Sequence, residues 1–246
     1  MNIFQSIWGA LTKPFRTLHS ILAYQLQPPP LNEFTDYDNY WEKRGKVPVI
    51  YRRWEVAAET FELNSTVLDV GCGNGEFLSY LREKRPDLIL KGCDTSAIGV
   101  ERAKSNGLDV FVHDLASGPP PGIYDYLTCL DVLEHIAYSE RAFRNLKSSF
   151  RKKIVISLPN IGCLRCRIRL AIFGKFPLTV CIFHVNEHLR HWTLKDFRYW
   201  MKQEDMIIER MEGQYGLRGF YRWFPSLFAH GLVYVMRRNE SSRSGL

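Results

Sequence analysis

The sequence predicts an α/β fold with a doubly wound, mostly parallel sheet. From residue 66 onward, short apolar segments typical of buried strands alternate with helical patterns, as in parallel sheets covered by helices on both faces. The first of these strands leads into a glycine-rich turn that opens a helix, which is typical of Rossmann-like folds. The chain has 246 residues, of which 46% are hydrophobic, so it can bury one core and carry an extension.

The beginning of the chain is expected to lie outside this core. Apolar residues at helical spacing predict an amphipathic helix over residues 1–26, and three prolines at 28–30 predict a linker. Residues 1–30 are therefore expected to form a helical N-terminal extension that packs on the domain or contacts a partner or a membrane surface. Residues 31–240 are expected to form the main domain, and residues 241–246 a disordered tail.

Seven strands are predicted within the main domain. The expected strands are 66–70, 88–93, 110–112, 126–130, 154–158, 206–211 and 232–236, and the expected helices are 52–63, 76–84, 97–105 and 143–150. The last two strands depart from the alternation and predict a terminal antiparallel pair. Residues 159–195 form an insertion that should cover the pocket, and we call it the roof insertion.

Positive charge is concentrated in one part of the chain. The formal net charge is +7, and residues 141–186 hold ten cations and no acid: Arg141, Arg144, Lys147, Arg151, Lys152, Lys153, Arg165, Arg167, Arg169 and Lys175. The first four recur at helical spacing and are expected on a solvated helix face. The block predicts an anionic acceptor, or an anionic surface that presents it, with a nucleic acid as the alternative.

The cysteines and the apolar segments indicate where the protein works. Six cysteines do not make a disulfide scaffold, no apolar stretch reaches the roughly 20 residues of a membrane span, and no signal-peptide pattern is visible. A cytoplasmic protein is expected, with possible peripheral contact at the inner membrane face. Cys163, Cys166, Cys181 and His184 have the spacing of a zinc site. A CxxC pair in a predicted helix is more often a pair of small apolar side chains, so we expect no zinc.

Three successive strands end in groups that could hold a nucleoside. Gly71 and Gly73 lack Cβ atoms and let a ligand lie against the backbone, while Glu76 at the helix start suits a ligand that carries a cation better than a phosphate. Asp94 is placed to accept hydrogen bonds from both ribose hydroxyls, although it could instead cap the next helix. Asp114, at the end of the third strand, could accept a hydrogen bond from an adenine amino group.

These motifs resemble those of the class I S-adenosylmethionine-dependent methyltransferases. The resemblance rests on residues 67–75, 92–94, 113–115 and 130–135 and spans about residues 37–238. It implies S-adenosylmethionine as the cofactor, with Asp69, Gly71, Gly73 and Leu130 at the methionine half, Asp94 at the ribose, Asp114 and Leu115 at the adenine, and Arg52 at the cofactor carboxylate. Arg53 stands next to Arg52, so the pairing with the carboxylate stays open between them.

A narrower resemblance suggests the class of acceptor. Residues 37–41, 158–161, 173–179 and 188–193 are similar to a subgroup that includes MetW-type proteins and methyltransferases of envelope sugars and natural products. This implies O-methylation of a small or lipid-linked acceptor, such as a sugar, polyketide or quinol hydroxyl. Two alternatives remain: an RNA 2′-O-methyltransferase that uses the basic residues 141–186, and a non-catalytic MetW-type partner protein. Neutralising Arg165, Arg167 and Arg169 is expected to weaken acceptor use and to spare cofactor binding.

A hydroxyl acceptor needs a base, and histidine titrates in the required range. His188, in the roof insertion, is the favoured base, and His135, after the fourth strand, is the second candidate. Asp131, Glu134 and His135, with a later histidine such as His188, are similar to the metal sites of quinone O-methyltransferases and small-RNA 2′-O-methyltransferases. Asp131 replaces the usual Glu of those families, and we expect no divalent metal.

Overall fold

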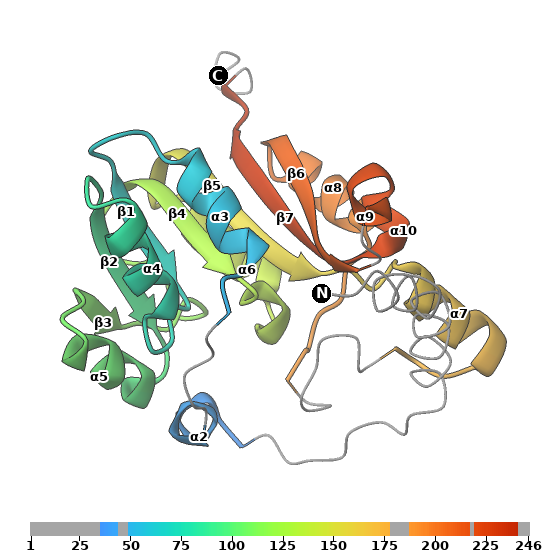
Figure 1. Ribbon diagram of the computed structural model, residues 1–246, viewed down its shortest axis with the longest axis horizontal. Helices are drawn as coiled ribbons and strands as arrows, with labels where there is room; N and C mark the ends of the chain where they lie inside the picture. The colour runs from blue at the N-terminus through green and yellow to red at the C-terminus, as the bar shows by residue number, and fades with distance from the viewer. Residues whose placement is uncertain (1–34, 44–48, 178–186, 217–218, 241–246) are drawn as a thin grey trace, which may run out of the picture.

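A single seven-stranded sheet organises the protein, with the strand order β3-β2-β1-β4-β5-β7-β6 (Figure 1). The computed structural model describes residues 35–43, 49–177, 187–216 and 219–240. The strands are β1 (Thr66–Val70), β2 (Ile89–Asp94), β3 (Val110–Val112), β4 (Tyr124–Leu130), β5 (Phe150–Pro159), β6 (Met206–Gly216) and β7 (Ala229–Arg238). β1 to β5 pair in parallel, and β7 pairs antiparallel with both β5 and β6. The predicted fold class is confirmed.

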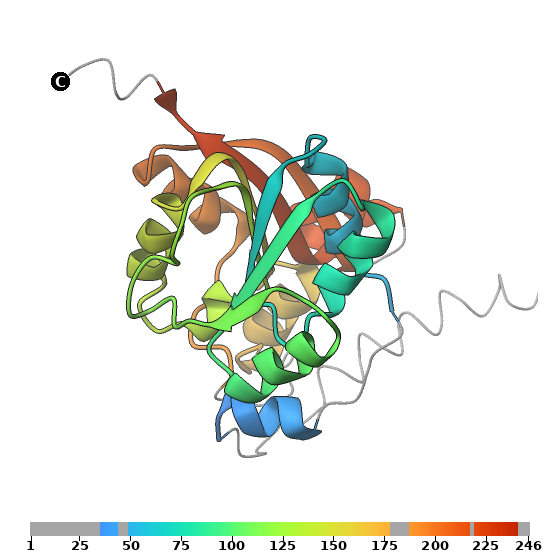
Figure 2. The same ribbon diagram turned by 90° about the vertical axis from the view of Figure 1, so that its left-hand side faces the viewer.

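Helices cover both faces of the sheet. They are α2 (Tyr37–Lys43), α3 (Arg52–Thr60), α4 (Glu76–Lys84), α5 (Ala97–Ser105), the 3-10 turn η1 (Leu133–His135), α6 (Ser139–Lys147), α7 (Leu164–Phe173), α8 (Leu194–Gln203), α9 (Phe220–Trp223) and α10 (Pro225–Phe228). Figure 2 shows α3 and α4 on one face and α6 and α8 on the other.

The buried strands explain why helices are needed on both faces. Val67 of β1 belongs to the apolar cluster that contains Trp54 of α3 and Phe77 of α4. The next residue, Leu68, belongs to the opposite cluster with Phe143 of α6. Successive side chains of a strand point to opposite faces, so a strand that is apolar at every position needs cover on both.

The structure corrects one predicted boundary. A helix was expected over residues 143–150, but α6 ends at Lys147 and β5 begins at Phe150, which is 1% exposed and pairs with Tyr124 of β4. Burial of the Phe150 ring in the sheet outweighs the helical spacing of the preceding cations. Arg151 therefore lies in a strand and does not extend the cationic helix face.

The segment between β6 and β7 contains the short helices α9 and α10, which were not among the expected helices. The N-terminal helix over 1–26, the linker at 28–30 and the tail at 241–246 lie outside the described residues. Within the described ranges, no helix is long and apolar enough to span a membrane.

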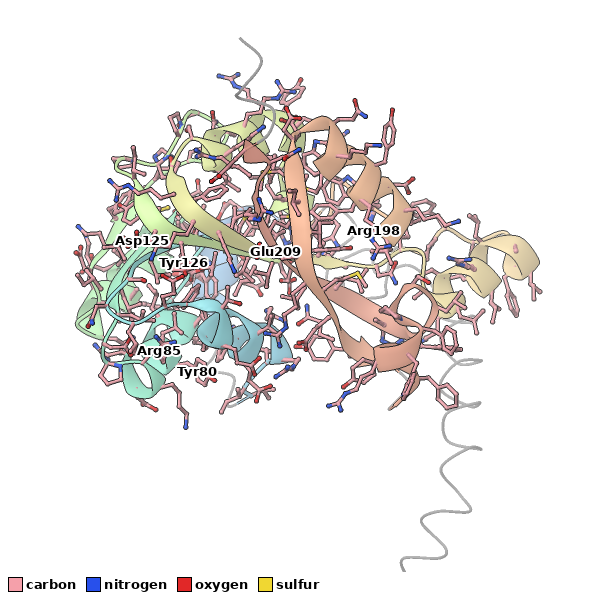
Figure 3. The ribbon with its side chains drawn as sticks, turned by 90° about the horizontal axis from the view of Figure 1, so that it is seen from above. Tyr80, Arg85, Asp125, Tyr126, Arg198 and Glu209 are labelled. Atoms are coloured by element: carbon pink, nitrogen blue, oxygen red, sulfur yellow. The ribbon has the colours of Figure 1, made fainter. Side chains whose placement is uncertain are left out.

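Side chains pin the loops at the amino-terminal edge of the parallel strands. Arg85, labelled in Figure 3, donates hydrogen bonds to the carbonyl oxygens of Ala58 (2.7 Å) and Phe61 (3.0 Å). Asp125 accepts a hydrogen bond from the backbone N–H of Thr66 at 2.9 Å, at the start of β1. The chain passes from β1 outward to β3 and then returns to β4 on the other side of β1, so the topological switch point, where such sheets bind ligands, lies between β1 and β4 at the carboxyl edge.

Candidate active site

A cavity of about 630 Å³ opens at the carboxyl ends of β1, β2 and β4. This volume is typical of sites for small molecules and cofactors. Its lining combines aromatic, acidic and histidine side chains. These include Tyr37, Tyr40, Trp41, Tyr51, Trp54, Asp69, Asp94, Asp114, Asp131, Glu134, Glu187, His113, His135 and His188. The cavity therefore lies at the position predicted from the switch point.

The glycine-rich turn after β1 brings two chain segments into close contact. Gly71 has φ +78°, and a Cβ atom there would lie 2.3 Å from Cγ2 of Val132, which follows β4. The backbone N–H of Gly71 donates to the carbonyl oxygen of Cys93 at 2.7 Å. A larger residue at position 71 would push apart the two loops that form the floor of the cavity.

Gly73, the second glycine expected at the cofactor, contacts an aromatic ring instead of the open cavity. A Cβ atom there would lie 2.0 Å from Cζ2 of Trp41, and Gly71 and Asn74 line the cavity on either side of it. Trp41 belongs to α2, which is attached beside the cavity: Asp38 accepts hydrogen bonds from Ser96 Oγ at 2.5 Å and from the Ile98 N–H at 3.1 Å. The aromatic segment 37–41 thus forms one wall of the site.

Two buried carboxyl groups lie at the floor of the cavity. Asp94 accepts hydrogen bonds from the backbone N–H groups of Gly73 (2.7 Å) and Ser96 (2.8 Å). Asp69 accepts one from Thr128 Oγ1 at 2.6 Å. Burial raises the pKa of Asp69 to about 7 against the opposing effect of the Thr128 hydrogen bond, and burial also raises the pKa of Asp94. A bound positive charge would therefore stabilise the ionised form of both carboxyl groups.

The structure places the residues expected around the adenine at the far side of the same cavity. Asp114 and Leu115 line it, and Asp114 Oδ1 accepts a hydrogen bond from the Ala116 N–H at 2.9 Å. Leu115 is 4% exposed and belongs to the core cluster, so its position is fixed. Leu130 also lines the cavity, at the end of β4.

Arg52 and Arg53 have different surroundings. Arg52 does not line the cavity; its guanidinium pairs with Glu55, Glu59 and Glu212, at distances between 2.8 and 3.1 Å. Arg53 does line the cavity, and its Nη1 atom lies 3.2 Å from both Asp131 Oδ2 and the Tyr215 hydroxyl. The structure therefore points to Arg53, and not to Arg52, as the guanidinium available to a ligand carboxylate, since α3 turns its second residue inward.

His135 and His188 come together in the cavity. Their ring centroids are 4.7 Å apart, although the residues are distant in sequence. His135 Nδ1 lies 2.8 Å from the carbonyl oxygen of Glu187; because a carbonyl only accepts, Nδ1 carries the hydrogen and Nε2 is the acceptor of the neutral ring. Burial, followed by the effects of His135 and His191, lowers the pKa of His188 to about 3, which keeps that ring neutral at physiological pH.

Glu134 is the most unusual carboxyl group of the site. Its side chain is completely buried, and neither carboxyl oxygen has a hydrogen-bond partner among the described residues. Burial, and then the charge of Asp131, raises its pKa far above the ordinary range. One oxygen lies 4.0 Å from His135 Nε2, so a proton or a cation between the two groups would satisfy both.

Only part of the expected four-residue metal set comes together. Ligand atoms of Glu134, His135 and His188 lie within 4.8 Å of one another. Asp131 is held elsewhere by Ser157 Oγ (2.5 Å) and Arg53 (3.2 Å), with its backbone at φ +56°. Three ligands of this kind could hold a divalent cation, and the expectation of a metal-free site stays a prediction.

The two described cysteines of the set considered for zinc do not line the cavity. Cys163 and Cys166 are buried at the start of α7, with their sulfur atoms 3.2 Å apart. Cys181 and His184 lie outside the described residues. The absence of zinc also stays a prediction.

The basic block does not form one surface. Arg144 and Lys147 approach Glu204, Lys152 pairs with Glu62 and Lys153 pairs with Glu209. Arg169 is 1% exposed and therefore cannot contact an external partner with Arg165 and Arg167, as the sequence had suggested. Among the described residues, none of the ten cations lines the cavity.

Comparison with known proteins identifies the fold and its chemistry. A family model described as a methyltransferase domain matches residues 40–209. The chain belongs to this family. It is therefore an S-adenosylmethionine-dependent methyltransferase of class I, as the sequence motifs predicted.

Individual relatives of this methyltransferase match it over parts of their length. It is 28% identical over 171 residues to the bifunctional methionine biosynthesis protein MetXA/MetW of Rhodopirellula baltica, which covers 63% of this chain and 27% of that protein. It is 30% identical over 126 residues to the ubiquinone biosynthesis O-methyltransferase of Paraburkholderia xenovorans, covering 44% of this chain and 52% of that protein. The chain thus spans about half or less of these curated relatives.

A solved structure shares the fold of the methyltransferase. The crystal structure of magnesium protoporphyrin IX methyltransferase from Synechocystis, with bound SAH, aligns with a TM-score of 0.54 at 18% identity. The alignment covers 89% of this chain and 94% of that chain. At this identity the likeness shows the fold alone.

The cavity residues of the methyltransferase fit S-adenosylmethionine. Gly71 lines the cavity floor with its backbone, and Asn74 Oδ1 is a buried acceptor that has no partner among the described residues. Asp69 and Asp94 offer carboxylates to a ligand that carries positive charge and ribose hydroxyls. Arg53 offers a guanidinium to a carboxylate. The donor and acceptor types of the cavity therefore match the polar groups of this cofactor.

Sequence reasoning missed three contributors to the site. Arg53 was considered only as a neighbour of Arg52, and Tyr215 and Glu187 were not considered. Tyr215 binds Arg53, and the Glu187 carbonyl fixes the ring of His135. The aromatic segment 37–41 was the available signal for the cavity wall, but no local pattern marks a backbone carbonyl such as that of Glu187.

Proposed function

We propose that the protein methylates a hydroxyl oxygen of a small or lipid-linked acceptor. The main support is the histidine pair at the cavity, because a hydroxyl must lose its proton during transfer and an acceptor nitrogen is present for it. The similarity to ubiquinone biosynthesis O-methyltransferases favours the same acceptor atom. Bound S-adenosylmethionine would supply the methyl group by an in-line displacement.

Aromatic side chains on one wall suit a ring or another flat acceptor. Tyr37, Tyr40 and Trp41 of α2 and Tyr51 at the start of α3 line the cavity. The Tyr37 ring meets the His135 ring edge-on, with centroids 5.8 Å apart. An aromatic or quinol acceptor could pack against this wall while its hydroxyl faces the histidines.

Within this proposal, His135 receives the proton of the acceptor hydroxyl, and His188 holds the His135 ring in position. The Glu187 carbonyl holds the His135 ring so that Nε2 is its acceptor atom. The low pKa of His188, about 3, makes that ring a weak proton acceptor, and its edge contact restricts the rotation of His135. This reverses the order of preference that the sequence suggested for the two residues.

Labelled methyl transfer tests the proposal directly. The protein is incubated with methyl-labelled S-adenosylmethionine and fractions of a host extract, and the labelled product is identified by mass spectrometry. We expect His135→Gln to lower kcat about 10²- to 10³-fold and to leave the cofactor Kd unchanged, since removing a general base has effects of this size. A methyl group found on nitrogen or carbon, or full activity of His135→Gln, would contradict the proposal.

Cofactor binding is tested separately by calorimetry. Asp94→Ala removes a buried carboxylate from the cavity floor, and we expect at least about a hundredfold weaker binding of S-adenosylmethionine, because hydrogen bonds to a charged group contribute about 1.5–3 kcal/mol each. Asp109→Ala, an exposed carboxylate on another loop, serves as the matched control and should bind normally. Undiminished binding by Asp94→Ala would contradict the assignment of Asp94.

The two alternatives have weaker support. An RNA substrate would need accessible cations, and several cations of the basic block are paired with acids or buried. A partner role like that of MetW-type proteins is favoured by the similarity to MetXA/MetW over 63% of the chain. Co-purification of an enzyme of methionine biosynthesis with a protein that transfers no methyl group would favour the partner role.

A further inference from the structure

Two neighbouring parts of the structure expose large apolar side chains. On and after α7 these are Leu170, Ile172, Phe173 and Phe176, and on α9 and just after it they are Phe220, Trp223 and Phe224. Trp223 is 82% exposed and Ile172 is 72% exposed, which are high values for side chains of this size. We call these seven residues, with the exposed cations Arg167, Lys175 and Arg222, the aromatic-basic face.

The two halves of this face lie at the same end of the molecule. α7 and the pair α9–α10 occupy one end in Figure 1, and the view from above in Figure 3 shows the same arrangement. Asn160, just before α7, donates hydrogen bonds to the carbonyl oxygens of Ser226 (3.2 Å) and Ala229 (2.9 Å) at the end of α10. Hydrogen bonds therefore connect the segment that precedes α7 to the end of α10.

The charge of this face has one sign. The sequence contains no Asp or Glu from residue 141 to 186 or from residue 213 to 239, the two segments that carry the face. Several cations elsewhere pair with acids; Arg210 of β6, for example, pairs with Glu59 and Glu212. An apolar surface bordered only by cations is complementary to an apolar layer bordered by anions.

We propose that the aromatic-basic face docks on an anionic lipid surface. Trp and Phe side chains favour the boundary between headgroups and acyl chains, aliphatic side chains such as Ile172 gain by insertion, and Lys and Arg are attracted to anionic headgroups. A nucleic acid would pair its phosphates with the cations and stack its bases on the aromatic rings, but it has no apolar layer to bury Ile172 and Leu170. The face therefore fits a bilayer better than it fits a nucleic acid.

The position of the face relates it to the cavity. Pro159 and Tyr215 line the cavity, and each lies at the end of a strand that leads into one half of the face. A docked protein would hold this side of the cavity near the membrane, where a lipid-linked acceptor is found. This last consequence rests on the proposed function, whereas the docking itself does not.

Vesicle flotation tests the docking with the full chain and without any methyl acceptor. We expect the protein to float with vesicles of phosphatidylcholine mixed with phosphatidylglycerol and to bind pure phosphatidylcholine at least about tenfold more weakly, because each Lys or Arg near an anionic surface contributes about 1 kcal/mol. Equal binding to both vesicles, or binding to neither, would overturn the proposal. Neither result would affect the test of methyl transfer.

Two pairs of variants locate the docking face. Lys175→Gln with Arg222→Gln should weaken binding more than about tenfold, and Ile172→Ser with Trp223→Ser should weaken it to a similar extent. The matched controls lie at the amino-terminal edge of the sheet: Lys84→Gln with Arg151→Gln for charge, and Leu63→Ser with Ile123→Ser for exposed apolar groups. The controls should change binding less than about twofold.

Other occupants of the face would give different results. If a second copy of the chain covers it, Ile172→Ser with Trp223→Ser would reduce the mass measured by light scattering and leave vesicle binding unchanged. If RNA covers it, Lys175→Gln with Arg222→Gln would abolish retention of a labelled RNA oligonucleotide and leave vesicle binding unchanged. Either outcome would overturn the proposal. Thermal unfolding by circular dichroism confirms that each variant is folded.

Discussion

At the scale of single residues, the carboxyl groups at the cavity floor link ligand binding to pH. Asp69 has a pKa of about 7 in the folded protein, above the ordinary value near 4, because burial outweighs its hydrogen bond with Thr128. Asp94 is buried beside it with a raised pKa, and the positive charge of Arg53 opposes the shift of the Asp69 pKa. A cationic ligand binds the ionised form of Asp69 more tightly than the protonated form.

Binding of S-adenosylmethionine should therefore weaken as the pH falls. Below pH 7 a proton must leave Asp69 when the ligand binds, so we expect the affinity to decrease by up to about tenfold per pH unit, and to level off above pH 7. Calorimetry across this range measures the slope, and Asp69→Asn should flatten it. Asp109→Asn is the control because this exposed carboxylate lies outside the cavity; a flat profile in the unmodified protein would contradict the expectation.

The site also shows which residues can be identified from sequence. Asp94 and Asp114 were found because each lies at the end of a recognisable strand, and the fold brings such positions to one edge; Asp69 was implied by the resemblance to the methyltransferases. The orientation of His135 was not predictable, since it depends on a carbonyl 52 residues later in the chain. Arg53 could not be distinguished from Arg52, because neighbouring residues of a helix point in different directions and the orientation of α3 about its axis decides which guanidinium faces the cavity.

At the scale of elements, Asn160 connects the roof insertion to the end of the sheet. Its side chain is 1% exposed; Nδ2 donates to the Ala229 carbonyl at 2.9 Å, and Oδ1 accepts from the Gly162 N–H at 3.0 Å. We expect Asn160→Ala to lower the free energy of unfolding by about 2–3 kcal/mol, because two buried backbone groups lose their partners. Urea denaturation measures this.

The exposed Asn106 provides the comparison for Asn160. Its side chain bonds only the Arg102 carbonyl, one turn earlier in the same helix, so Asn106→Ala should change the free energy of unfolding by less than about 0.5 kcal/mol. Equal effects of the two substitutions would show that Asn160 does not hold the two segments together.

Elements were predictable where one local signal dominated. Every expected strand exists. The signal was clearest for central strands such as β1 and the second half of β5, whose apolar residues are buried on both faces. The start of β5 was misassigned because Arg144, Lys147 and Arg151 keep a helical spacing across a boundary that only the burial of Phe150 reveals. The helices α9 and α10 were missed because each has only four residues, which is too few to show a period.

At the scale of the whole molecule, the last strand in the chain occupies an interior position. β7 lies between β5 and β6, and its residues Leu232 to Met236 are almost completely buried. A chain that ends after Gly216 would leave β5 and β6 without a shared partner and would remove this part of the core. We expect this truncation to abolish cooperative unfolding in circular dichroism, since the apolar surface of β5 would be exposed.

A chain that ends after Glu240 is the control for this truncation. It retains all of β7 and should unfold with a midpoint within about 2 °C of the full chain, because it removes only residues that follow β7 in the sequence. Cooperative unfolding of the shorter chain would mean that β7 is dispensable.

The interior place of β7 has a consequence for biosynthesis. Synthesis proceeds from the N-terminus, so β6 leaves the ribosome before β7, its neighbour in the sheet, exists. An unpaired strand at that stage can pair with strands of other nascent chains and aggregate, and charged side chains commonly prevent this. Glu209, Arg210 and Glu212 interrupt the apolar residues of β6, so the strand carries charges that keep it soluble until β7 has been made.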